Sequence, residues 1–253
     1  MAEFIAKSCN VVSVYEKDVA LATRLAEETG ALLHTLRRTS RLEGRALGDA
    51  GDKQANDFLL RELAACRPLD AVLSEESHDD RERLNAMRLW IIDPLDGTRE
   101  YREQRSDWAV HVALVDRGVV IAAAVAQPSR SEVFSSTATP TPVLSKRVIV
   151  VSRSRPPAKA PAIAQALDAT LEPMGSAGVK ALAVVRGEAL AYVHEGGLNE
   201  WDAAAPIGVA LAHGLHVSDL QGRAIVFNQH DVVLHGGLII CRAECAEAIH
   251  RVL

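Results

Sequence analysis

The stretch WIIDPLDGT, residues 90–98, says more about the fold than any other part of this sequence. Its apolar start predicts a strand held in the core, and the proline and glycine predict a turn directly after it. Asp93 and Asp96 stand three residues apart across that turn, so their carboxylates can be aimed at one point. Gly97 permits close approach of the backbone, and the amides of Gly97 and Thr98 can face an anion.

Two other interpretations of this segment remain open. Asp-Pro and Asp-Gly pairs are common turn formers, so the segment taken alone is as consistent with an ordinary turn. The haloacid-dehalogenase phosphatases carry a nucleophilic aspartate in a D-x-D-G-T run. Here the acids are spaced D-x-x-D, which puts the nucleophile out of register and disfavours that class.

Acidic residues also stand at the ends of other apolar elements. Glu75 and Glu76 end a short strand, Asp52 is expected at the N-cap of a helix over residues 52–67, and Asp202 opens another helix. If these acids converge, each close pair costs about 4 kcal/mol at an effective dielectric of 20. A hard cation that prefers carboxylate oxygens would offset this cost, and magnesium is the natural candidate.

The remaining pattern predicts a layered α/β or α+β architecture, with two sheets and helices between or outside them. A long amphipathic helix is expected from a capping Asp18 to residue 38, followed by a polar connection over 40–51. Residues 107–128 predict a hairpin turning at 116–118, and 131–136 a further strand. The segment 137–146 is rich in proline, threonine and serine and predicts a lobe boundary, after which strands and helices alternate.

Composition excludes several classes of protein. A net charge of −5 over 253 residues gives no broad basic surface, so no nucleic-acid polymer is expected as a partner. No signal peptide or membrane-spanning run is visible, which predicts a cytoplasmic protein without a membrane partner. Cys9, Cys66, Cys241 and Cys245 form no CxxC pair and are expected to be free thiols. The nine histidines form no HxxxH or HExxH motif, and surface or capping roles are expected for all of them.

Three motifs together carry a resemblance. WIIDPLDGT, preceded by VLSEES and followed about a hundred residues later by EWDAAAP, resembles the signature set of the inositol monophosphatase family. Among its branches, the sequence is most similar to the CysQ type, the 3′(2′),5′-bisphosphate nucleotidases, over roughly residues 18–250. The resemblance implies an α+β fold, a layered αβαβα sandwich of the sugar-phosphatase type. An N-terminal lobe, 1–140, would carry most metal ligands, and a C-terminal lobe, 141–253, would carry Asp202 and substrate contacts.

The resemblance also implies the chemistry of individual residues. Two or three Mg²⁺ ions would be held by five side chains and one backbone carbonyl: Glu75, Asp93, the carbonyl of Leu95, Asp96, Asp202 and Asp52. Thr98, hydrogen-bonded to Asp52 or Glu75, would activate the attacking water, without a phosphoenzyme. Substrate contacts are implied at Asp96, Gly97, Thr98, Arg99, Gly175, Ser176, Lys180, Glu200 and Asp202.

Two of these placements leave alternatives. The family pattern T-x-A-D-x-x-A-x-x-x-I aligns with DAGDKQANDFL so that Asp52 takes the aspartate position, whereas Asp57 breaks the apolar spacing. Asp49 stands where the family usually has threonine, a departure at the third metal position. The GSAG segment resembles the family's substrate-contacting turn, yet by itself it would be taken as an ordinary helix-entry turn around Ser176.

The implied activity is magnesium-dependent hydrolysis of the 3′-phosphate of 3′-phosphoadenosine 5′-phosphate, a reaction of sulfur metabolism. The alternative is a phosphatase of the same fold that acts on inositol 1-phosphate or fructose 1,6-bisphosphate, with several substrates accepted by one enzyme. A non-catalytic anion- or metal-binding module is disfavoured because such a module has no need of the Thr98 hydroxyl. Lithium inhibition and a homodimer are further expectations from the resemblance.

Overall fold

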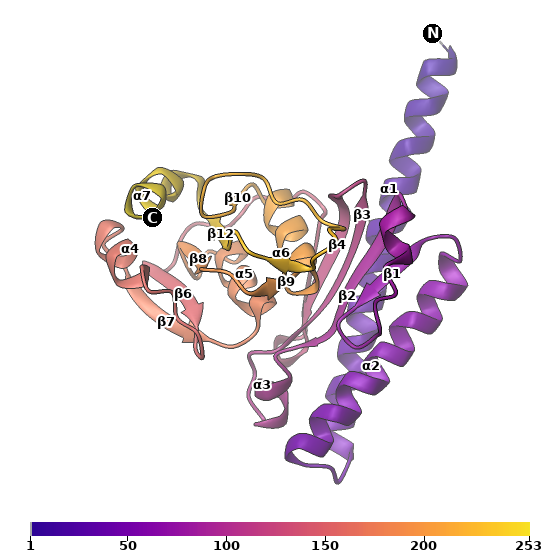
Figure 1. Cartoon of the computed structure of the whole chain (residues 1–253), viewed down its shortest axis with the longest axis horizontal. Helices are drawn as coiled ribbons and strands as arrows, with labels where there is room; N and C mark the ends of the chain where they lie inside the picture. Colours follow the sequence, from indigo (N-terminus) through magenta and orange to yellow (C-terminus); the bar gives the residue numbers. More distant parts are fainter. Residues whose placement is uncertain (1) are drawn as a thin grey trace.

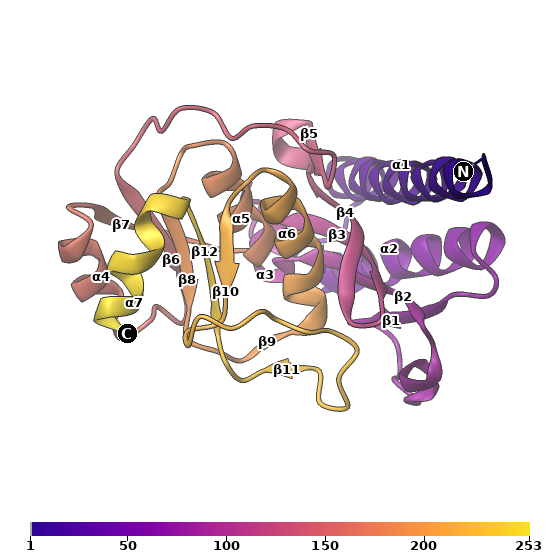
Figure 2. The ribbon, with the colours of Figure 1, turned by 90° about the horizontal axis from the view of Figure 1, so that it is seen from above.

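The computed structural model describes residues 2–253, with side chains from Tyr15 onward. Two five-stranded sheets alternate with three layers of helices, as the views in Figure 1 and Figure 2 show. Helices α1 and α2 cover the outer face of the first sheet, α5 and α6 lie between the sheets, and α4 and α7 cover the second sheet. The expected αβαβα layering is therefore confirmed.

The first sheet has the strand order β1-β2-β3-β4-β5. Its strands are β1 (Ala71–Ser74), β2 (Arg88–Asp96), β3 (Ala109–Asp116), β4 (Val119–Gln127) and β5 (Glu132–Ser135). Only β1 and β2 pair in parallel; the other neighbours are antiparallel. The expected hairpin is confirmed, with Arg117 and Gly118 forming the turn between β3 and β4.

The two N-terminal helices begin earlier than expected. Helix α1 spans Ala2–Thr39, so Asp18 lies inside it; its carboxylate is buried and pairs with Arg67 and Arg88 at 2.7 and 3.0 Å. Asp18 therefore forms ion pairs with two arginines that are distant in the sequence, and it does not cap the start of a helix. In the figure the first turns of α1 extend beyond the body of the molecule (Figure 1).

Helix α2 spans Gly44–Cys66, so most of the expected polar connection is helical and Asp52 is not an N-cap. Gly48 and Gly51 allow neighbouring side chains to pack closely against the helix and do not interrupt it. A Cβ added to Gly51 would lie 3.1 Å from side-chain atoms of both Leu95 and Tyr101, so one of these side chains would have to move to admit it.

The second sheet has the order β10-β12-β8-β6-β7. Its strands are β6 (Val148–Ser152), β7 (Thr170–Met174), β8 (Ala191–His194), β10 (His216–Ser218) and β12 (Leu238–Cys241); β9 (Leu198–Asn199) and β11 (Val233–Leu234) form a small separate pair. The helices are α3 (Thr98–Arg102), α4 (Ala160–Ala166), α5 (Ala177–Val185), α6 (Glu200–Ala212) and α7 (Ala246–Val252), with short 3₁₀ turns at Glu82–Asn85, Pro128–Arg130 and Ala243–Cys245.

The middle helices join the two halves of the chain. All nine residues of α5 are buried, and α6, although it comes from the second half, packs on strands β2, β3 and β4 of the first sheet. Residues 136–147 run without regular structure between the sheets. A division into lobes at 140/141 stays a prediction.

The sequence predicts no membrane-spanning helix and no disulfide. No helix among residues 2–253 has the length and apolar character needed to cross a membrane. Cys66, Cys241 and Cys245 are free thiols, while the side chain of Cys9 lies outside the described residues.

Candidate active site

Three acids separated in the sequence meet at the end of β2. Oxygen atoms of Asp93, Asp96 and Asp202 all lie within 4.8 Å of one another. Residues three apart on a regular strand face opposite sides, but the pairing of β2 with β3 shifts register between Asp93 and Asp96. This irregularity lets both side chains reach the first turn of α6, where Asp202 lies.

Glu75, directly after β1, is the fourth member of this acidic cluster. Glu75 is exposed overall, yet surrounding atoms displace water from its carboxyl; this desolvation, followed by the charge of Asp202, raises the pKa of Glu75 to about 7. Burial and the neighbouring Glu75 raise the pKa of Asp93 well above its ordinary value. Burial and Asp96 raise the pKa of Asp202 to about 6. The four acids therefore repel one another, and a bound cation would offset this repulsion.

The donor set fits a hard divalent cation. The Oδ2 atom of Asp93 is buried and has no hydrogen-bond partner among the described residues, so it is available as a ligand. The carbonyl oxygen of Leu95 lies at the same turn, 3.2 Å from the Thr98 hydroxyl oxygen, and has lone pairs for a metal ion. Carboxylate and carbonyl oxygens are the ligands that magnesium prefers. The cluster can thus hold a metal ion.

Asp96 connects this cluster to the second half of the chain. Its Oδ2 accepts hydrogen bonds from the Ser176 hydroxyl at 2.5 Å and from the Gly178 amide at 2.7 Å. Ser176 also caps α5 by accepting a hydrogen bond from Val179, so the helix-entry role and the active-site role coincide. Burial raises the pKa of Asp96, but His111 and the other donors outweigh burial and hold that pKa well below its usual range.

His111 is a site residue that the sequence did not reveal. It lies on β3 opposite Asp93, fully buried, with Nε2 3.1 Å from Asp96 Oδ2 and Nδ1 3.1 Å from the carbonyl of Trp201. The expectation of surface or capping roles for every histidine is therefore wrong here. Burial lowers the pKa of His111, but Asp96 raises it by more. The available signal was a polar residue inside the apolar run AVHVALV.

Asp52 and Thr98 also meet. The hydroxyl of Thr98 donates to Asp52 Oδ1 at 3.2 Å, because the middle of α2 faces the turn after β2. Burial, then the charge of Glu76, raises the pKa of Asp52 to about 7. Asp57 points to solvent and pairs with Lys53 at 2.7 Å. Of the two alternatives, the structure brings Asp52 to Thr98.

A cavity of about 160 Å³ opens beside the cluster. Among the sequence-predicted residues, it is lined by Asp96, Arg99, Gly175, Ser176, Lys180 and Asp202. Lys180 is buried and its ammonium donates to the carbonyls of Gly175 and Ser176 at 2.8 and 2.6 Å. Arg99 is largely exposed and pairs with Glu103.

Gly97 and Glu200 are not among the residues that line this cavity. Gly97 adopts φ +93° against the backbone of Asp107, where a Cβ would lie 3.2 Å from the carbonyl oxygen. Glu200 is buried away from the cavity lining, and its two carboxylate oxygens accept hydrogen bonds from the amides of Asn228 and Gln229. The structure therefore does not bring Glu200 to the cavity.

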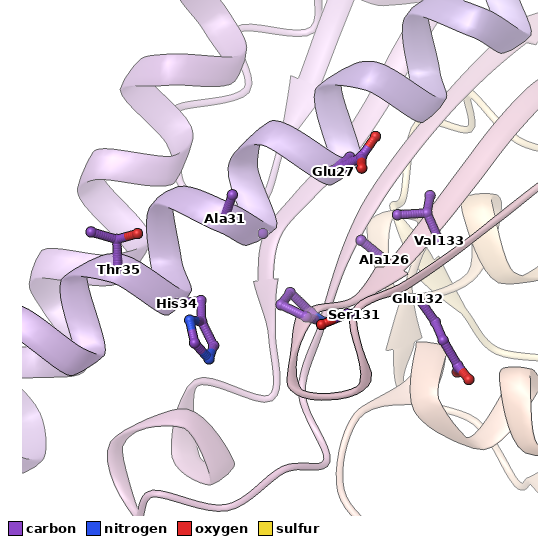
Figure 3. Close-up of a pocket in the computed structure, with 10 residues that line it drawn as sticks. Glu27, Ala31, His34, Thr35, Ala126, Ser131, Glu132 and Val133 are labelled. Atoms are coloured by element: carbon purple, nitrogen blue, oxygen red, sulfur yellow. The ribbon is translucent and has the colours of Figure 1, made fainter.

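A second cavity, of about 300 Å³, lies between α1 and strands β4 and β5 (Figure 3). Glu27 and His34 line it from α1, and Ser131 and Val133 line it from the other side. Its lining contains none of the sequence-predicted site residues, so the chemistry is assigned to the smaller cavity beside the acids.

Comparison with known proteins agrees with this arrangement. The inositol monophosphatase family model matches residues 11–252. The chain is 48% identical over 246 residues, 90% of each chain, to a protein of Mycobacterium leprae named 3′-phosphoadenosine 5′-phosphate phosphatase. It is 51% identical over 212 residues, 79% of each chain, to the Mycobacterium bovis protein of that name.

A solved structure shares the fold. The CysQ protein of Bacteroides thetaiotaomicron superposes with a TM-score of 0.77 at 22% identity, covering 89% of this chain and 97% of that one. Because the family model and both mycobacterial relatives cover most of the sequence, the chain belongs to the inositol monophosphatase family.

Proposed function

We propose that this protein is a magnesium-dependent phosphatase that hydrolyses the 3′-phosphate of 3′-phosphoadenosine 5′-phosphate, giving AMP and inorganic phosphate. The observation that carries the proposal is the 48% identity, over 90% of both chains, to a phosphatase of that name. The four acids that converge beside a cavity support it, because phosphate-ester hydrolysis needs concentrated positive charge and a place for the substrate.

Two or three magnesium ions would be held by Glu75, Asp93, Asp96, Asp202 and the carbonyl of Leu95, with Asp52 at a further position. When bound, the ions supply the positive charge that stabilises the phosphoryl oxygens and lowers the pKa of water. The side chains and backbone of this chain supply the remaining steps.

Thr98 and Asp52 orient and deprotonate the attacking water. Because the Thr98 hydroxyl donates to Asp52, its oxygen lone pairs are free to accept a hydrogen bond from water. Asp52, which accepts the hydrogen bond of that hydroxyl, is the group proposed to take up the proton. The amides of Gly97 and Thr98 are proposed to bind phosphate oxygens, and Gly175, Ser176, Lys180 and Arg99 to contact the remainder of the substrate. Glu200, which lies outside the cavity lining, stays a predicted substrate contact.

Phosphate release tests the proposal directly. With magnesium, we expect kcat/KM for 3′-phosphoadenosine 5′-phosphate to exceed that for inositol 1-phosphate and fructose 1,6-bisphosphate by at least about tenfold. Asp96→Asn should stay folded and lose magnesium-dependent activity. A strong preference for inositol 1-phosphate would overturn the substrate assignment, and a trapped phosphoaspartate would overturn the direct attack by water.

Three further expectations rest on family resemblance. We propose that millimolar lithium inhibits the enzyme by competing at one of the carboxylate-lined metal positions. We also propose that the protein works in the cytoplasm and forms a homodimer. Sedimentation analysis of the purified protein tests the homodimer, and phosphate release in a lithium titration tests the inhibition.

A further inference from the structure

The imidazole of His111 lies next to every element that carries an acid of the three-aspartate cluster. Its Nε2 is 3.1 Å from Asp96 Oδ2, and its Nδ1 is 4.0 Å from Asp93 Oδ2. Nδ1 is also 3.1 Å from the carbonyl oxygen of Trp201, the residue before Asp202. Because a carbonyl oxygen can only accept a hydrogen bond, Nδ1 carries a hydrogen and donates it to Trp201. One ring therefore connects the end of β2 with the first turn of α6.

The fold leaves room for this ring and for little else. On β3, His111 points to the same side as Ala109 and Ala113, which are small and fully buried. On the facing helix α5 stands Gly178, where a Cβ would lie 2.2 Å from Nε2. A polar ring costs free energy when it is buried inside an apolar strand. The contacts with the aspartates and with α6 are the interactions that offset this cost.

Asp96 is held from both halves of the chain. The Ser176 hydroxyl and the Gly178 amide, both from the second half, donate to its Oδ2 at 2.5 and 2.7 Å. His111, from the first half, approaches the same oxygen atom. Its Nε2 makes no aligned hydrogen bond to a described residue, so the contact with Asp96 is electrostatic. His111 does not line the cavity beside the acids, so it can act on a ligand only through the residues that it contacts.

We propose that His111 is a positioning residue of the metal site. It holds the carboxylate of Asp96 in place relative to the first turn of α6, so that Asp96 and Asp202 face the same cation although they come from different halves of the chain. Outer partners of ligating groups typically contribute about 10- to 100-fold to metal affinity. The inference rests on the proposed function, because it concerns the magnesium site described there.

Three substitutions separate the two contacts of the ring. His111→Gln can place an amide nitrogen near the position of Nε2 and so keeps a neutral donor toward Asp96. His111→Asn can place one near the position of Nδ1 and keeps the donor toward Trp201. His111→Leu fills the space and keeps neither donor.

Magnesium affinity is the quantity to compare among these variants. We expect His111→Asn and His111→Leu to bind magnesium about 10- to 100-fold more weakly than the parent, and His111→Gln to retain most of the affinity. A magnesium titration followed by Tm, without substrate, measures this affinity independently of catalysis. The magnesium dependence of phosphate release should show the same order of variants.

The matched control is His213→Asn. His213 is also buried, and its Nδ1 contacts the carbonyl of Val209 at 2.8 Å at the far end of α6, so its loss should leave magnesium affinity unchanged. The Tm of each metal-free variant measures its folding. Equal affinities of His111→Gln and His111→Asn, or losses of affinity that simply follow the metal-free Tm, would overturn the positioning role and leave the proposed function standing. Absence of magnesium-dependent activity in the parent would remove both.

Discussion

The Thr98 hydroxyl donates a hydrogen bond to Asp52 Oδ1 at 3.2 Å, although the two residues stand 46 positions apart. The contact joins the turn after β2 to the middle of α2. It places a carboxyl with a pKa of about 7 behind the hydroxyl that faces the acidic cluster. Two residues that act through one hydrogen bond should fail together when either is changed.

At saturating magnesium, Thr98→Ala and Asp52→Asn are therefore each expected to lower kcat about 10²- to 10³-fold, because general-base assistance is lost. The kcat of the double variant should be no lower than that of the less active single variant. Thr98→Ser keeps the hydroxyl and should retain most activity. Steady-state kinetics measures all four proteins, and additive losses would show that the residues act independently.

Asp93→Asn should remove the stabilisation that magnesium gives. Ligand at 100 times its Kd stabilises the parent by about 2.7 kcal/mol, which is about 5 to 10 °C in Tm for a domain of this size. Without magnesium, the variant should have a Tm equal to or above that of the metal-free parent, because the substitution removes one of the mutually repelling carboxylates. Asp57→Asn, at an exposed residue paired with Lys53, is the matched control and should keep the magnesium shift. Calorimetric Tm values with and without magnesium decide the matter.

Magnesium binding should strengthen as pH rises. The folded-state pKa values of Glu75 and Asp52 are about 7 and that of Asp202 about 6, all above the ordinary values of 4.5 and 3.8. Acids with raised folded-state pKa hold protons longer in the native state, so their contribution to metal-free stability falls between about pH 4 and 7. The same protons compete with the metal ions. The magnesium-induced Tm shift should therefore grow from pH 5.5 to 8; a flat profile would contradict the assigned ligands.

Gly178→Ala should disturb the joint between α5 and β3. A Cβ at this position would lie 2.2 Å from His111 Nε2, which is closer than atoms can pack, so α5 or the imidazole must move. We expect a loss of about 1 to 3 kcal/mol in the free energy of unfolding, measured in urea, together with reduced activity. In a His111→Ala background the same substitution should cost less. An equal cost in both backgrounds would rule out this clash as the cause.

Local sequence was sufficient for the strands and for the motif residues on them. The apolar run before Asp93, the hairpin over 107–128 and the alternation after residue 147 each predicted the element that forms there. The strands are visible in the chain because period and turn chemistry act over a few residues. The choice of Asp52 over Asp57 came from the resemblance to the family pattern, and the structure brings Asp52 to Thr98.

Residues whose role comes from a distant partner were mistaken or missed. The sequence predicts a helix cap at Asp18 because it does not show that Arg67 and Arg88 lie beside this residue. It predicts a connection at glycines that allow close packing in α2. The sequence does not identify His111 as a site residue, because only the folded chain brings it next to Asp96.

The sequence by itself determined the elements, the family and the acids that the motifs mark. The tertiary structure decided which side chains those acids meet, through the register shift in β2, the burial of α5 between two sheets and the cavity beside Lys180. The physical reason is that charge, burial and unsatisfied hydrogen bonds are properties of neighbours in space, and for these residues the neighbours lie tens of positions away along the chain.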